Sequence, residues 1–73
     1  MKIVAVVSEE FIDRVEEVRQ SLLAVAGLIN LEYEERYNIF SAVLGLPSEI
    51  STVRNVPGIQ MADADTGLKV QAV

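Results

Sequence analysis

The sequence predicts an α+β fold, a ferredoxin-like βαββαβ sandwich in which a four-stranded antiparallel sheet carries two helices on one face. Three observations lead to this prediction. Apolar runs of strand length occur near both ends and in the middle of the chain, and a long segment after the first run has the apolar period of a helix. A later segment marked by proline has room for a shorter helix. Read in order, the elements are strand, helix, strand, strand, helix and strand.

Length and composition allow one small domain with an apolar core. The chain has 73 residues, and 51% of them are hydrophobic, which is too apolar for a disordered chain. Domains of this size bury roughly 60% of the surface that the unfolded chain exposes. Cysteine is absent, so disulfides and thiolate zinc sites are excluded. We therefore expect a folded domain of modest stability.

The first strand is predicted over residues 1–7, where the chain is β-branched and almost continuously apolar. Ser8 is a suitable N-cap for the helix that follows, and three acidic residues fall in its first turns, where the helix dipole favours negative charge. Gly27 is expected to end this helix. Apolar residues at three- and four-residue steps form one buried stripe on it: Phe11, Val15, Val18, Leu22, Val25 and Ile29.

A change of period at Leu31 predicts a β-hairpin. Leu31 and Tyr33 alternate with glutamates, residues 35–38 form a polar bend, and residues 39–44 return as an apolar strand. The aromatic side chains of this region are expected to pack in the core or on the sheet rather than bind a ligand. They are Tyr33, Tyr37 and Phe40.

The last two elements are marked by proline. Pro47 suits the first turn of a short second helix, and Pro57 ends it, because proline cannot continue the hydrogen-bond ladder. Two apolar residues of this helix are expected to face inward, Ile50 and Val53. Residues 59–62 then alternate as a last strand, in which Met61 is expected to fill the core.

Charge and the length of the apolar runs exclude two kinds of partner. The net charge is −5, and the six basic residues are scattered, so we expect no nucleic-acid partner. The short apolar run at the N-terminus is too brief for a signal peptide or a membrane span. We therefore expect a soluble chain with no membrane partner, and the lack of cysteine is compatible with the cytoplasm.

Residue usage also argues against catalysis. The chain has no histidine, so its serines lack the usual base, and it has no glycine-rich phosphate loop. A carboxylate-only mechanism or a hard-metal site is formally open through two groups of carboxylates, but charge runs of this kind usually mark a solvated face. The two groups are Glu32, Glu34 and Glu35, and Asp63 and Asp65. We expect no catalytic residue, no cofactor and no bound metal.

The second half of the chain carries a more specific pattern. Residues 37–65, YNIFSAVLGLPSEISTVRNVPGIQMADAD, run from an apolar strand through a short helix and a proline-glycine turn to a second apolar strand and an acidic pair. This stretch resembles the second half of the subtilisin propeptide and propeptide-like protease inhibitor family, and AVAGLINLEY lies near that family's helix-to-strand glycine. Two features depart from the family. Leu28 stands where many members have a second glycine, and the acidic strand end carries only the small residues Ala62 and Ala64 beside its two aspartates.

The resemblance implies a protein that binds a subtilisin-like serine protease and performs no chemistry itself. Members of the family bind through the exposed sheet surface, and their C-terminal segment lies extended in the substrate cleft. By this resemblance, Asp63 and Asp65 would cap helix N-termini of the protease, since strand residues two apart project on the same side.

The expected division of the chain is a propeptide-like domain over residues 1–65 and an extended tail over residues 66–73. The tail would add a strand to the edge of the cleft, where alternate side chains fill pockets. The tail residues in this role are Leu68, Lys69, Val70, Gln71, Ala72 and Val73.

Other interpretations remain open. Asp63 and Asp65 can serve only to solubilise a strand end, and the tail can pair with a sheet edge of its own chain or of a second copy, which would give a homodimer. A different class is a regulatory or assembly module of the ACT or Lrp-effector type, which shares this element order and dimerises through sheet edges. Because the chain begins with methionine and has no protease domain, we prefer a free-standing inhibitor or folding chaperone over a cleaved propeptide.

Overall fold

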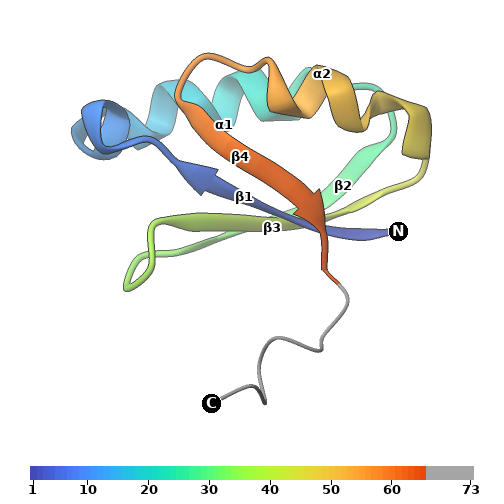
Figure 1. Cartoon of the computed structure of the whole chain (residues 1–73), viewed down its shortest axis with the longest axis horizontal. Coiled ribbons are helices and arrows are strands. Elements are labelled where there is room, and N and C mark those ends of the chain that lie inside the picture. The colour runs from blue at the N-terminus through green and yellow to red at the C-terminus, as the bar shows by residue number, and fades with distance from the viewer. Residues whose placement is uncertain (66–73) are drawn as a thin grey trace.

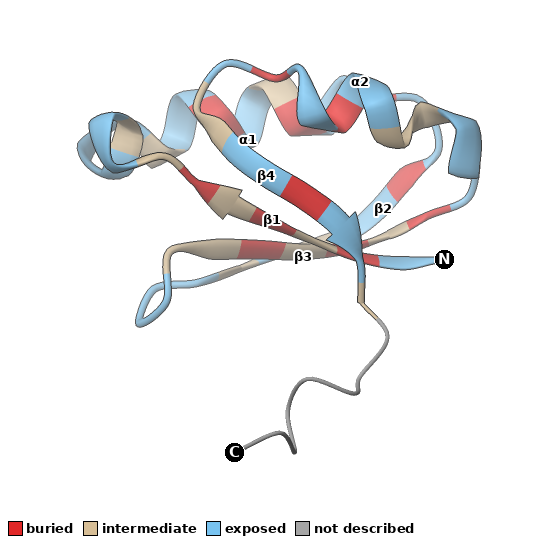
Figure 2. Ribbon diagram, viewed as in Figure 1, coloured by how far each residue is buried: buried red, intermediate tan, exposed pale blue. Residues whose placement is uncertain are grey.

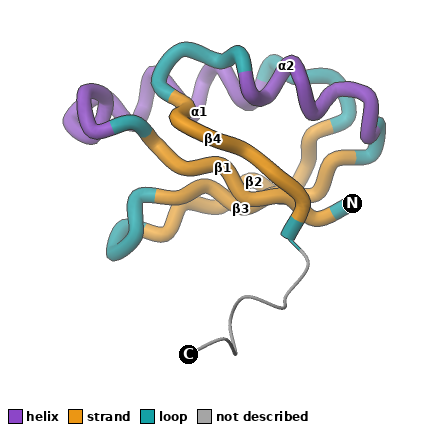
Figure 3. The backbone as a smooth tube through the Cα atoms, viewed as in Figure 1, coloured by secondary structure: helices purple, strands orange, loops and turns teal. Residues whose placement is uncertain are grey.

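The computed structural model describes residues 1–65 and confirms the predicted α+β architecture. A four-stranded sheet has the order β2-β3-β1-β4, and all three neighbouring pairs are antiparallel. The strands are β1 (Lys2–Val7), β2 (Leu28–Glu34), β3 (Ile39–Leu44) and β4 (Ile59–Ala64). The helices of the described chain lie on one side of this sheet, as expected for a ferredoxin-like arrangement (Figures 1 and 3).

Each helical segment begins as a 3-10 helix and continues as an α-helix. The first is η1 (Glu9–Arg14) followed by α1 (Val15–Leu23), and the second is η2 (Pro47–Glu49) followed by α2 (Ile50–Arg54). The hydroxyl of Ser8 accepts the Glu10 amide at 3.3 Å, which confirms the predicted cap. Pro47 occupies the first turn of the second segment, as predicted.

The first helix is shorter than its apolar period predicts. It ends at Leu23, and the placement of Ile29 on its buried stripe is wrong, because Ile29 lies in β2 with 56% of its surface exposed. Gly27 does not cap the helix but lies in the turn into β2, with a φ of 80°. A Cβ at this position would lie 3.0 Å from Cγ of Leu46, so the tight turn requires glycine.

The core lies between the sheet and the helices, where Figure 2 shows the buried residues. Residues of β1 and β3 alternate between buried and partly exposed, so one face of each strand packs against the helices. Tyr33 packs on Phe40 with ring centroids 4.8 Å apart, as predicted, whereas Tyr37 is 64% exposed. The largest fully buried side chains are Phe40, Ile3, Leu22, Leu44, Val18 and Val53.

The turn before β4 packs closely against the first helical segment. Gly58 has a φ of 97°, and a Cβ there would lie 2.6 Å from Cγ2 of Val18 and 2.9 Å from the ring of Phe11. The carbonyl of Gly58 accepts the amide of Ser8 at 2.7 Å. The predicted turn at Pro57 and Gly58 is confirmed, and it brings β4 beside β1.

The side chain of Met61 faces the other way from its prediction. Met61 is 55% exposed, whereas its neighbour Ala62 is 4% exposed and belongs to the core. Pairing with β1 sets this orientation, because Ala62 lies opposite the buried Ala5 and Met61 lies opposite Val6. The predicted alternation of residues 59–62 does not hold, because the register with β1 shifts between Val6 and Val7: Ile59 packs against the core, whereas Met61 lies on the other face.

Candidate functional site

The sheet face that points away from the helices is apolar at its centre, and we call it the open face. Because strand side chains alternate, it is built from the residues that lie between the buried ones. No helix within residues 1–65 covers it (Figure 2). Its apolar side chains are partly or mainly exposed: Val4, Val6, Ile29, Ile39, Val43 and Met61.

Strand register places these side chains in rows across the sheet. Met61, Val6 and Ile39 lie opposite one another on β4, β1 and β3, so they form an apolar row over three strands. A second apolar contact joins Ile29 of β2 to Val43 of β3. The open face therefore offers a continuous surface rather than single exposed residues.

Acidic side chains stand at both edges of the open face. Glu34 ends the row that contains Ile39, and Glu32 lies opposite Ser41 in the next row. At the other edge, Asp63 lies opposite Val4. A partner surface that is apolar with positive charge on two sides would complement this arrangement.

Asp63 is tied to its own molecule while it remains accessible. Its Oδ1 accepts the amide of Ala64 at 2.8 Å and lies 3.5 Å from Nη2 of Arg54. The side chain is nevertheless 67% exposed. The structure thus brings the predicted site residue to the rim of the open face and adds Arg54, which the sequence analysis did not select.

Asp65 lies just beyond the end of β4 and remains paired with the sheet. Its amide donates to the carbonyl of Lys2 at 2.7 Å, which extends the ladder with β1 by one residue. Asp63 and Asp65 are thus both held at the β4 edge. The remaining predicted protease-binding residues lie outside the described residues: Leu68, Lys69, Val70, Gln71, Ala72 and Val73.

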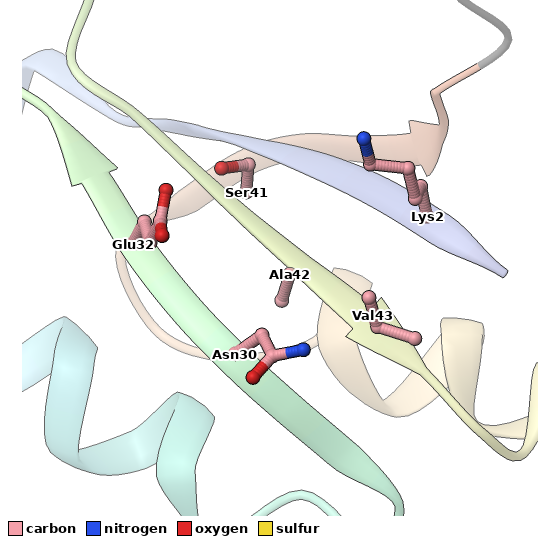
Figure 4. A pocket seen from close by; sticks show the side chains of 6 residues that line it. All are labelled: Lys2, Asn30, Glu32, Ser41, Ala42 and Val43. Atoms are coloured by element: carbon pink, nitrogen blue, oxygen red, sulfur yellow. The ribbon is translucent and has the colours of Figure 1, made fainter.

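A shallow hollow of about 270 Å³ lies on the open face between β1, β3 and β2 (Figure 4). It forms where β2 bulges, since the register shifts between Ile29 and Glu32 and Asn30 has a φ of 55°. Its volume is below the usual range of ligand pockets. Its lining combines both charges with small side chains: Lys2, Asn30, Glu32, Ser41, Ala42 and Val43.

Two further findings concern the described residues. Within residues 1–65, no group of three or more acidic side chains is arranged to hold a metal ion. None of the helices in this part of the chain combines the length and apolar character that crossing a bilayer requires.

Sequence reasoning missed Ile29, Met61 and Arg54 as components of this surface. Ile29 continues the period of the preceding helix, and Met61 is as apolar as a core residue. The usable signal for Met61 was the small size of Ala62, which fits a strand position beneath a packed helix.

No protein-family model, curated protein or solved structure matches the chain.

Proposed function

We propose that this protein inhibits a subtilisin-like serine protease, or assists its folding, by docking the open face on the enzyme and laying residues 66–73 in the substrate cleft. The observation that carries the proposal is the apolar open face with carboxylates along its edges. The resemblance of residues 37–65 to propeptide-like inhibitors supplies the class of partner. Such an inhibitor occupies the cleft and needs no catalytic residue.

The physical support comes from the area that docking would cover. Monomeric proteins rarely leave large contiguous apolar patches exposed, so a row such as Met61, Val6 and Ile39 is typical of an interaction surface. Asp63 at the rim is exposed enough to accept hydrogen bonds from a partner. Helix N-termini are suitable partners, because their first amides lack acceptors and carry partial positive charge.

The test is titration of several subtilisin-type proteases with the purified chain. We expect stoichiometric loss of activity, and no loss for a chymotrypsin-type protease used as a control. A chain without residues 68–73 should remain folded and lose most of its potency. Full protease activity at micromolar concentrations of the chain, across several enzymes, would contradict the proposal.

A second candidate is a regulatory or assembly module of the ACT or Lrp-effector type. The observation that favours it is the presence of two edge strands, β2 and β4, in the described sheet. Such a module should leave subtilisin-type proteases unaffected. Removal of residues 68–73 would then change its oligomeric state or its response to a ligand instead of its inhibitory potency.

A further inference from the structure

The direction of the backbone groups along β4 follows from one hydrogen bond. Asp65 donates its amide to the carbonyl of Lys2, so Asp65, Asp63 and Met61 direct their backbone groups toward β1, as far as the bulge that precedes Met61. The residues between them direct theirs away from the sheet, at the outer edge of β4. These outward residues are Ala62 and Ala64.

Two of the outward backbone groups are occupied by side chains. Nε of Arg54 donates to the carbonyl of Ala62 at 2.9 Å. The amide of Ala64 donates to Oδ1 of Asp63 at 2.8 Å. The guanidinium and the carboxylate are themselves 3.5 Å apart, so the two side chains form one continuous cover, which we call the edge bracket.

We propose that the edge bracket closes β4 to a second copy of this chain, and that its removal lets two copies pair through their β4 edges. Within the described part of β4, a strand can add beyond the bulge through the outward groups of Ala62 and Ala64. Arg54 holds the carbonyl of Ala62. An incoming strand must therefore displace a charge-assisted hydrogen bond before it gains its own.

Symmetry makes a second copy the fitting occupant. In a two-fold antiparallel pair centred on Ala62, the outward groups of the two Ala62 residues bond to each other, and Met61 lies beside Asp63 of the second copy. No like charges meet. At the β2 edge, by contrast, a pair centred on Tyr33 sets Glu32 opposite Glu34 of the second copy.

The test compares Arg54→Ala with Arg36→Ala, and it does not depend on any protease. Both substitutions remove one positive charge from an exposed residue that pairs with a carboxylate, but Arg36 lies in the hairpin between β2 and β3. We expect the mass of Arg54→Ala, measured by sedimentation, to rise with concentration to about twofold the monomer value. Hydrogen exchange of the Ala62 amide should slow in parallel.

The wild-type chain and Arg36→Ala should show neither change. Three results would overturn the proposal: an Arg54→Ala chain that stays monomeric, one that associates without protecting the Ala62 amide, or a wild-type chain whose Ala62 amide is already protected in a dimer. If circular dichroism shows that Arg54→Ala does not fold, Arg54→Met decides. It keeps the aliphatic part of the side chain and removes the group that donates to the Ala62 carbonyl, so a monomer with an unprotected Ala62 amide would also overturn the proposal.

Discussion

The helix-covered face and the open face of the sheet are made by alternate residues of the same strands, yet the side chains on the two faces differ in how far they are buried. On the covered side, Ile3, Phe40 and Leu44 are almost completely buried. On the open side, Val6 and Ile39 are only partly covered, although they are as apolar as the core residues beside them. Burial rather than composition separates the two faces. One face supplies the stability, and the other leaves apolar surface exposed, where the proposed docking would take place.

The sharpest test of this difference is truncation of two adjacent residues on opposite faces of β3. Phe40→Ala should lower the free energy of unfolding by about 3–5 kcal/mol, because it leaves a cavity in the core. That is a large part of the roughly 4–11 kcal/mol expected for a domain of this length. Ile39→Ala should cost about 1 kcal/mol, since its side chain is already partly solvated. Urea denaturation of both variants measures this contrast, and equal losses would contradict it.

A second test concerns the close packing on the covered face. Gly58→Ala should destabilise the protein by about 1–3 kcal/mol, because the left-handed φ and the 2.6 Å approach to Val18 leave no room for a Cβ. Gly45→Ala is the matched control, since its nearest neighbour would be the carbonyl oxygen of Gly27 at 3.4 Å. Thermal unfolding should show a lower melting temperature for Gly58→Ala alone. A similar decrease for Gly45→Ala would show that close packing at Gly58 is not the cause.

The open face is tested by adding the same charge on the two sides of the sheet. Met61→Lys lies in the apolar row of the open face, whereas the control Gln20→Lys lies on α1, on the helical side of the sheet (Figure 1). Both residues are exposed, so each change should alter stability by less than about 0.5 kcal/mol. Met61→Lys should weaken protease inhibition about tenfold, equivalent to about 1.4 kcal/mol. Equal inhibition by the two variants would exclude the open face as the docking surface.

Local signals in the sequence were sufficient to predict the order of the helices and strands and most of their boundaries. The cap at Ser8, the helix start at Pro47 and the turn at Gly58 each depend on residues a few positions apart, and each is confirmed. The C-terminal end of the first helix was not predicted, because the apolar residues of β2 continue the helical period as far as Ile29. Periodicity alone cannot separate two elements whose apolar residues happen to stay in phase.

The candidate site was less predictable because strand pairing decides it. Whether Met61 or Ala62 faces the helices depends on the register between β4 and β1, which are far apart in the sequence. The contact of Arg54 with Asp63 likewise requires the chain to turn at Gly58 first. Asp63 was selected through a family resemblance rather than through any local rule. Its place at the rim of the open face follows from tertiary structure.

The smallest predicted effect concerns a hydrogen bond in the hairpin between β2 and β3. The hydroxyl of Tyr33 donates to Oδ1 of Asn38 at 2.7 Å, across a turn in which Asn38 has a φ of 55°. Tyr33→Phe removes this partly buried hydrogen bond and keeps the ring against Phe40, so it should cost about 1 kcal/mol. Tyr37→Phe removes an exposed hydroxyl from the same hairpin and should cost almost nothing. Urea denaturation that gives both variants the same stability would show that the hairpin is held by strand pairing and ring packing, without help from this bond.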